Sequence, residues 1–277
     1  MKGIAVTVVA AGLIAGCVET PQRTSSTAGS QAGAPSQSFN LADWKLTLPV
    51  DEDGEAGGDE AMEVESLAGY VNPQYFFGAT DGAMVFTAGV DGATTSGSRY
   101  PRSELREMRG DERAAWTLAE GGTMTATLAV NAVPTRDDGS PGRLIVGQIH
   151  GEDEELVRLY YEDGSVYFVN DQAGDDDEET DFTLENASGE EPDIGLNERF
   201  SYLIDARGDT LIVEVHADGA VYRSTTPIND VWQSDTFYFK AGVYLGVNDE
   251  GGTGVGRVSF YALDFGHSPG SGRGGLS

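Results

Sequence analysis

The sequence predicts an all-β fold in which antiparallel sheets pack as a sandwich or a jelly roll. Many short segments alternate between apolar and polar residues, which is the pattern of strands with one buried face. Glycine is abundant, at 38 residues, and turn signals separate the alternating segments, whereas no helical pattern of any length competes. The predicted strands are 102–107, 123–130, 143–149, 156–161, 165–169, 200–207, 210–216, 220–226, 238–248 and 257–265, with tight turns at 162–164, 207–209 and 217–219.

The N-terminal residues are predicted to be an export signal. Lys2 precedes a short apolar run that is too short to span a membrane and is followed by small residues. The stretch Ile14-Ala15-Gly16-Cys17 resembles a bacterial lipobox, and Cys17 is the only cysteine of the chain. We therefore expect a signal peptide over 1–17, lipidation of Cys17, and an exported protein whose only membrane contact is a lipid anchor; a plain secretory signal is the alternative.

One large domain is expected after this signal. Residues 18–38 are rich in Ser, Thr, Ala, Gln, Gly and Pro and predict a flexible linker. The folded domain is expected over 39–267, and residues 268–277 are predicted to form a disordered tail. With a single cysteine the domain can form no intramolecular disulfide, so its core alone must stabilise it. We expect it to act as a monomer.

The formal net charge is −29, which disfavours nucleic-acid binding because that needs a basic surface. The acidic residues gather in loops at 51–60, 151–155 and 174–181. A diffuse acidic surface suits a protein that works in salt. None of the loops keeps the ligand pattern of an EF-hand, so a structural calcium is unsupported, and no His, Cys and Asp spacing predicts another metal.

Three predicted strands carry unusual polar faces. In 238–248, Tyr238, Lys240, Tyr244 and Asn248 alternate with buried apolar residues. In 143–150, the alternation predicts that Leu144, Val146, Gln148 and His150 share one face, with Ile145, Gly147 and Ile149 on the other. In 102–107, Arg102, Glu104 and Arg106 share a face, where the glutamate would orient both arginines for an anion. Singly, each pattern is common on a solvated strand, but together they predict a cationic surface for a carboxylated ligand.

The same residues carry a resemblance to a known family. The blocks RSELRE (102–107), QIH (148–150) and YFKAGVY (238–244), with WKLTLP (44–49) before them, resemble the signature blocks of the family 7 polysaccharide lyases, the alginate lyases. The resemblance covers about 41–265 and implies a β-jelly roll with a substrate cleft along its concave sheet. One departure is Gly246, where the family usually has a glutamine.

The resemblance implies cleavage of the 4-linked uronate polymer alginate by β-elimination, with no cofactor. Arg102, Gln148 and His150 would surround the sugar carboxylate; His150 and Tyr244 would supply the base and the acid, although the ordinary pKa of tyrosine is about 10. Substrate contacts are expected from Arg106, Glu104, Lys240, Tyr238 and Asn248. Isoleucine in QIH, here Ile149, accompanies activity on guluronate-containing blocks in this family, and the alternation predicts that it points into the core.

Other functions stay open from the sequence. A carbohydrate-binding jelly roll without activity needs the arginine face but not His150 together with Tyr244. A lyase for another polyuronate would use the same residues. A sandwich glycoside hydrolase needs two carboxylates on one strand face, and the pair Glu179 and Asp181 lies instead in an acidic loop. A structural surface lipoprotein is the remaining alternative.

Overall fold

The computed structural model describes residues 31–174 and 177–267. The predicted signal peptide with Cys17, most of the predicted linker and the predicted tail lie outside these residues. No helix in the described part of the chain is both long and apolar enough to cross a membrane.

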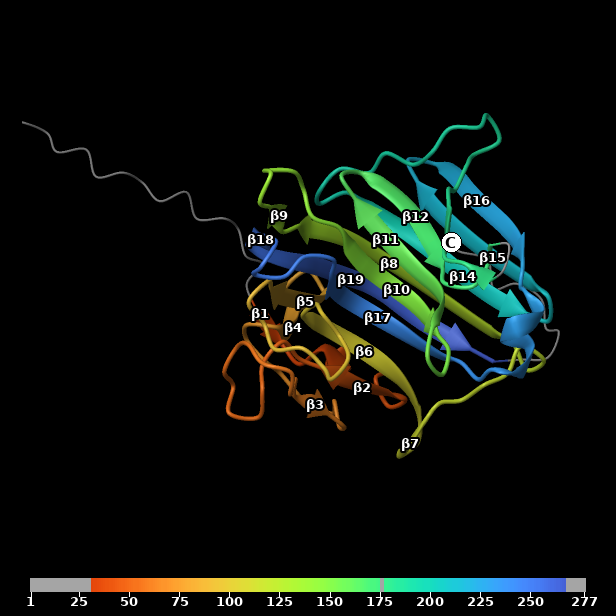
Figure 1. The fold of residues 1–277 in the computed structure, drawn as a ribbon. Helices are drawn as coiled ribbons and strands as arrows, with labels where there is room; N and C mark the ends of the chain where they lie inside the picture. Colours follow the sequence, from red (N-terminus) through yellow and green to blue (C-terminus); the bar gives the residue numbers. More distant parts are fainter. Residues whose placement is uncertain (1–30, 175–176, 268–277) are drawn as a thin grey trace, which may run out of the picture.

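Two large antiparallel sheets lie face to face (Figure 1). The prediction of an all-β sandwich of antiparallel sheets is therefore confirmed. The eight-stranded sheet has the order β1 (Gln31–Gly33), β4 (Phe76–Ala79), β5 (Met84–Gly89), β19 (Val255–Gly266), β8 (Gly122–Ala132), β14 (Arg199–Arg207), β15 (Thr210–Ala217) and β16 (Ala220–Pro227).

The nine-stranded sheet contains all three strands with unusual polar faces, next to one another as β10, β17 and β6. Its order is β13 (Thr180–Phe182), β12 (Ser165–Asn170), β11 (Glu155–Glu162), β10 (Leu144–His150), β17 (Tyr238–Leu245), β6 (Arg102–Arg109), β2 (Trp44–Thr47) and β3 (Glu63–Val64), with β7 (Glu112–Arg113) on β6. A small pair, β9 (Thr135–Arg136) and β18 (Gly252–Thr253), and two 3-10 helices, η1 (Pro35–Gln37) and η3 (Asp230–Ser234), complete the described elements.

The predicted hairpin turns form where the sequence places them. Asp163 and Gly164 join β11 to β12 with φ of 48° and 91°, and Asp218 and Gly219 join β15 to β16 with φ of 51° and 76°. Positive φ at both central residues is typical of the type I′ turn, whose twist matches that of antiparallel strands. Gly208, with φ of 61°, turns β14 into β15.

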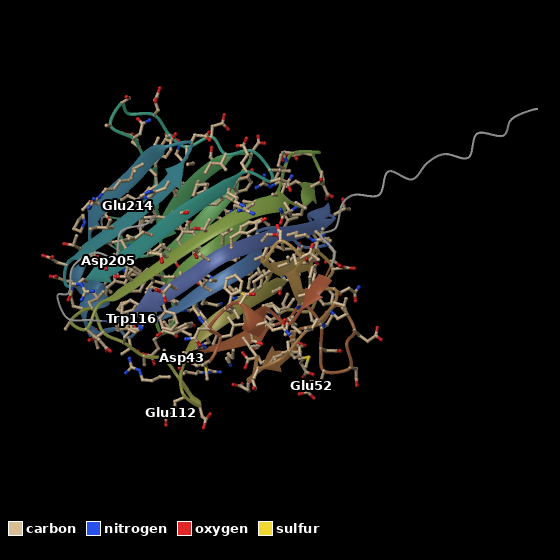
Figure 2. The ribbon with its side chains drawn as sticks, turned by 180° about the vertical axis from the view of Figure 1, so that it is seen from behind. Asp43, Glu52, Glu112, Trp116, Asp205 and Glu214 are labelled. Atoms are coloured by element: carbon tan, nitrogen blue, oxygen red, sulfur yellow. The ribbon has the colours of Figure 1, made fainter. Side chains whose placement is uncertain are left out.

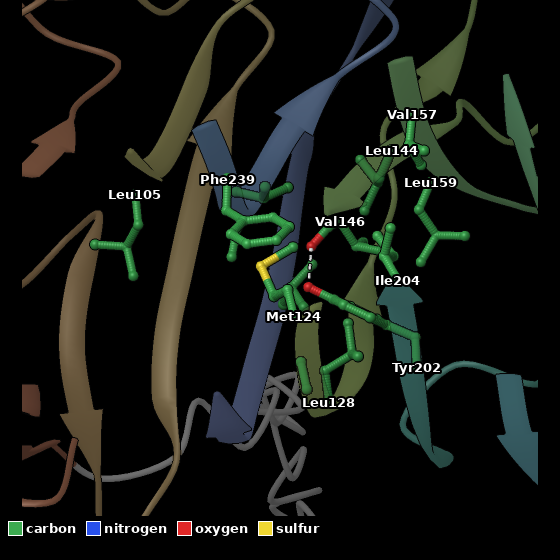
Figure 3. Packing of buried hydrophobic residues seen from close by; sticks show 14 of the residues in the cluster. Leu105, Met124, Leu128, Leu144, Val146, Val157, Leu159, Tyr202, Ile204 and Phe239 are labelled. Atoms are coloured by element: carbon green, nitrogen blue, oxygen red, sulfur yellow. Dashed lines mark hydrogen bonds between the residues drawn. The ribbon is translucent and has the colours of Figure 1, made fainter. Parts of the chain in front are cut away.

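The core lies between the sheets and is built from alternate residues of both (Figure 3). From β17 it receives Phe239, Ala241, Val243 and Leu245, all with no exposed surface, as the alternation predicts. Ile149 also lies in this core, which confirms its predicted direction. Viewed from the other side, the eight-stranded sheet turns acidic residues such as Asp205 and Glu214 outward (Figure 2).

The end of the predicted linker differs from a tether. Residues 31–33 form strand β1 on β4, and both Ala34 and Pro35, the first residue of helix η1, are buried. The low content of large apolar residues hid this segment, because backbone pairing with β4 needs no apolar side chain. The described fold therefore begins before Phe39.

Candidate active site

A β-bulge in β10 decides which way its polar residues point. On the β11 side, Ile145 pairs with Tyr160 and Gly147 with Leu159, so Val146 is the extra residue. Leu144 and Val146 consequently face the core, whereas Ile145, Gln148 and His150 face outward beside β17. The prediction that Leu144 and Val146 share the face of Gln148 was wrong, because strict alternation fails at a bulge.

Glu104 lies at the centre of a buried polar network. It accepts hydrogen bonds from Lys240 at 2.8 Å, from Arg102 at 3.2 Å and from the side-chain amide of Gln148. Glu104 and Gln148 have no exposed surface, and Lys240 and Arg102 are 7% and 9% exposed. Glu104 therefore orients the cations rather than meeting a ligand. It does not bond Arg106, so its predicted role in orienting both arginines holds for Arg102 only.

The opposite charges of this network stabilise one another. Burial alone would raise the pKa of Glu104, but the charges of Lys240 and Arg102 outweigh it and hold that pKa below its usual value. Burial lowers the pKa of Lys240, to about 8, and the charge of Arg102 adds to this effect while Glu104 opposes it. Removing one partner of such a buried ion pair strongly destabilises the fold, because the other charge is then left buried without compensation.

Tyr244 is held at one end of the network. The guanidinium carbon of Arg102 lies 3.7 Å from the centre of the Tyr244 ring. The Tyr244 hydroxyl is 3.0 Å from Oγ of Ser98, which in turn accepts a hydrogen bond from Arg102 at 2.8 Å. Since the Ser98 hydroxyl also donates to the carbonyl of Tyr100, a consistent assignment has Tyr244 donating to Ser98.

His150 is held at the other end, opposite Tyr238. Its ring stacks on Tyr238 with centroids 4.9 Å apart and planes within 13°. Nδ1 lies 2.8 Å from the carbonyl oxygen of Gly151 and therefore carries a hydrogen, and Nε2 lies 3.2 Å from Oε1 of Glu155. Between the two ends lies the pair formed by Gln148 and Lys240.

The electrostatics keep His150 neutral. Burial is the largest cause and lowers its pKa to about 4, and the charge of Lys240 acts in the same direction. A neutral imidazole with its hydrogen on Nδ1 has its lone pair on Nε2, which is the form that a general base needs. The arrangement thus offers a base, a phenol and a row of fixed cations on one sheet face.

Comparison with known proteins shows the family of the chain. A family model described as "Alginate lyase" matches residues 39–267. The chain belongs to the alginate lyase family. An alginate lyase from Klebsiella pneumoniae is 37% identical over 259 residues, covering 76% of this chain and 84% of that relative.

Solved structures of alginate lyases share the fold. The crystal structure of the alginate lyase from Klebsiella pneumoniae superposes with a TM-score of 0.75 at 32% identity, over 85% of this chain and 99% of the other. A family 7 alginate lyase, A1-II′, is known as a histidine-to-asparagine and tyrosine-to-phenylalanine double variant in complex with a substrate, GGMG. It matches with a TM-score of 0.69 at 29% identity, over 87% and 100% of the two chains. The jelly-roll assignment is thereby confirmed.

Among the remaining predicted residues of this alginate lyase, Arg106 joins the outward face and Asn248 does not join the network. The guanidinium carbon of Arg106 lies 3.7 Å from the centre of the Tyr238 ring. No carboxylate of residues 31–174 and 177–267 forms an ion pair with Arg106. Asn248 follows the end of β17 and donates to the carbonyl of Arg99 at 3.3 Å.

Two further cations of the same face, Lys45 and Arg158, were missed by the sequence analysis. Lys45 pairs with Arg106 across β2 and β6, and Arg158 pairs with Gln148 across β11 and β10. Both follow a period of two, Lys45 between Trp44 and Leu46 and Arg158 between Val157 and Leu159, so the signal was present. Lys45 is bonded to Glu63 at 2.5 Å, and Arg158 is bonded to Asp171 and Glu179.

An acidic group lies beside His150. Carboxylate oxygens of Glu154, Glu155 and Asp171 approach within 4.8 Å of one another. Asp171 is already engaged by the guanidinium of Arg158. We therefore interpret the group as part of an ion-pair network. The described residues give no further support for a calcium site.

Proposed function

We propose that this chain cleaves alginate by β-elimination on the outward face of β10, β17 and β6, with guluronate-containing blocks favoured. The observation that carries the proposal is that Gln148, His150 and Tyr244 emerge beside one buried cationic network from two neighbouring strands. Alginate is a polymer of uronates, so each sugar brings a carboxylate to this face.

The first requirement of the reaction is to neutralise the carboxylate next to C5. The C5 hydrogen is weakly acidic because its loss adds negative charge beside an existing anion. Arg106 is a half-buried cation without an ion-pair partner in the described chain, so it can meet this carboxylate. Gln148 has no exposed surface and its amide donates to Glu104, so in our proposal it holds the cationic network in place. Fixed donors of this kind stabilise the developing charge without having to reorganise.

The second requirement is a base and an acid. In our proposal Nε2 of His150 takes the C5 hydrogen of guluronate as a proton, and the electron pair of that bond becomes the C4–C5 double bond. The bond from C4 to the bridging oxygen breaks, and that oxygen takes the hydroxyl proton of Tyr244. The step leaves an imidazolium and a phenolate, which exchange protons with solvent to reset the site.

Mannuronate presents its C5 hydrogen from the opposite side of the ring, so the same division of roles does not serve it. There Tyr244 acts as both base and acid. The substrate complex of A1-II′ was obtained with a histidine and a tyrosine replaced, which fits a pair of this type in that relative.

Ile149 supports the preference for guluronate only through its position. It is fully buried and lies between Gln148 and His150 on β10. Its side chain cannot touch a substrate, so its size affects the preference only through the positions of Gln148 and His150. Ile149→Val would remove one buried methylene group and shift both residues slightly.

Mass spectrometry of products made in heavy-oxygen water tests the reaction type. Elimination predicts that every cut leaves an unsaturated non-reducing end, because no water adds to the product. Hydrolysis would instead leave saturated non-reducing ends, with products heavier by one labelled water, and would overturn the proposal. Binding of alginate without any product would favour a carbohydrate-binding protein instead.

A further inference from the structure

Arg143 stands opposite Gly246 at the end of the strand pair that carries Tyr244. The amide of Gly246 donates to the carbonyl of Arg143 at 3.0 Å, one step beyond the pair Leu144 and Leu245 and two beyond the pair Ile145 and Tyr244. Since Gly246 and Tyr244 are two residues apart, any side chain at 246 would emerge on the face of Tyr244, directly beside Arg143.

The absence of a side chain at Gly246 is what gives Arg143 its place. A Cβ atom built on Gly246 would lie 2.6 Å from Cγ and 3.2 Å from Nε of Arg143. Real Cβ atoms do not make contacts as short as the first of these, so the Arg143 side chain would have to move. Gly246 has no left-handed φ that would by itself demand glycine. The space, rather than the backbone conformation, is therefore what glycine contributes.

The guanidinium of Arg143 is held over an aromatic platform. Its central carbon lies 4.4 Å from the centre of the Tyr160 ring, and it donates a hydrogen bond to the Tyr167 hydroxyl at 3.3 Å. The two tyrosine rings stack with centroids 5.3 Å apart. Tyr160 and Tyr167 pack in the same outward cluster as Tyr244, which places Arg143 beside the proposed acid.

The charge of Arg143 is not taken up by an ion pair among the described residues. Glu162, whose field it feels, is bonded instead to Arg136 at 2.6 Å and to the Tyr167 hydroxyl at 2.8 Å. Arg143 is thus a half-buried, oriented cation with donors to spare, in a chain of net charge −29. Such a group is suited to a carboxylate, which a guanidinium binds through two parallel hydrogen bonds.

We propose that Arg143 binds a carboxylate of the uronate chain beside Tyr244, in space that Gly246 leaves open, and so helps to determine which uronates this protein accepts. The inference rests on the proposed function, since it takes the substrate to lie along β10 and β17. Arg106 and Arg143 then mark the two ends of the bound segment, next to His150 and Tyr244 respectively.

The test is a double-mutant cycle on KM and on binding. Arg143→Met removes the charge, and because a charge-assisted hydrogen bond contributes about 1.5–3 kcal/mol we expect KM for alginate to rise about tenfold or more, with kcat within about twofold. Gly246→Ala should reproduce this rise because it displaces Arg143. The double variant should be no worse than either single one, since both remove the same contact.

Arg199→Met is the matched control. Arg199 also lies over a tyrosine, 3.5 Å from the centre of the Tyr261 ring, but it belongs to the eight-stranded sheet. Its loss should leave KM unchanged. An unchanged KM in Arg143→Met, or effects of Arg143→Met and Gly246→Ala that multiply, would overturn the inference.

Direct binding separates this inference from the proposed reaction. Calorimetry with alginate oligosaccharides in a His150→Ala background measures affinity without turnover. Weaker binding on adding Arg143→Met supports the role of Arg143 whatever the reaction type. Equal affinity with and without the Arg143→Met substitution would overturn the inference even where β-elimination is established.

Discussion

The hydroxyl of Tyr202 on β14 donates a hydrogen bond at 3.3 Å to the carbonyl oxygen of Val146 on β10, across the core (Figure 3). Val146 is the extra residue of β10 against β11, so it has no paired residue on that strand. A Cβ on Gly147 would lie 2.7 Å from the same hydroxyl. Tyr202 and Gly147 thus fix the bulge that turns Gln148 and His150 outward.

Tyr202→Phe should therefore lower activity from a distance. It leaves a buried carbonyl unpaired, at a cost of about 1–2 kcal/mol in the free energy of unfolding. We expect kcat to fall as Gln148 and His150 lose their fixed position. Tyr161→Phe is the control, because its hydroxyl donates to the carbonyl of Ile194 at 2.8 Å, outside the site. Denaturant unfolding and kinetics on both variants check the prediction, and equal kcat in the two would contradict it.

The same bulge separates the features of the fold that could be predicted from the sequence from those that could not. Alternation and turn residues were enough for the strands, the hairpins at Asp163 and Asp218, and the direction of Ile149. Alternation could not reveal the extra residue Val146, since a bulge depends on Tyr202, a partner 56 positions away. Alternation also could not predict that Glu104 is fully buried among cations, because the strands on either side decide whether a charged residue is buried.

Glu104→Gln should destabilise the protein by about 3–5 kcal/mol, because it leaves Lys240 buried without a carboxylate. The pKa of Glu104 is lowered in the fold, so its contribution is present above the ordinary carboxyl value and disappears as the pH falls through the folded value. The difference from the wild type should therefore shrink in acid.

Denaturant titrations over a pH series measure this difference. Glu120→Gln is the control, because its ion pair with Arg109 is exposed and should contribute less than about 1 kcal/mol. Lys240→Met added to Glu104→Gln should recover part of the loss by removing the unpaired charge. A double variant less stable than Glu104→Gln would speak against the network as described.

Activity should rise with pH through a step that depends on Glu155. Burial, with the nearby carboxylate of Asp171, raises the pKa of Glu155 to about 8, so below that pH it is protonated and can donate to Nε2 of His150. Loss of that proton at higher pH frees the lone pair of His150. We expect kcat/KM to climb across this range in the wild type.

Glu155→Ala should flatten the profile, since nothing then covers Nε2. Glu154→Gln, at the exposed neighbouring position, should keep the wild-type profile. The measurement is kcat/KM for the three proteins over a pH series, together with melting curves to confirm folding. A climb that persists in Glu155→Ala would assign it to another group.

His267 should stabilise the fold at low pH rather than at high pH. Its Nε2 lies 2.6 Å from Oε1 of Glu107 and its Nδ1 lies 3.0 Å from the carbonyl oxygen of Gly121, so both nitrogens carry hydrogens. Burial opposes the charged form, but Glu107 outweighs it and raises the pKa of His267. Its contribution is therefore complete below the ordinary histidine value of about 6.5 and is lost as the pH rises through the folded value.

His267→Gln should accordingly lower Tm most in mildly acidic buffer, with a stability loss of about 1–2 kcal/mol there, and least in alkaline buffer. His216→Gln, on the outer face of the eight-stranded sheet, should cost less because its pair with Glu214 is 31% and 18% exposed. Thermal unfolding over a pH series decides this. A loss that grows with pH would reverse the assigned charge state.

The most direct test of the account is the growth of near-ultraviolet absorbance, which unsaturated uronates produce and hydrolysis products do not. It should be followed for the wild type, His150→Ala and Tyr244→Phe, separately on polyguluronate and polymannuronate. We expect growth with the wild type, faster on polyguluronate. Because general acid–base groups contribute about 10²–10⁴-fold, His150→Ala should lose at least about 100-fold on polyguluronate and Tyr244→Phe as much on both polymers. No growth with the folded wild type, or rates near the wild type in both variants, would contradict the proposed reaction at this site.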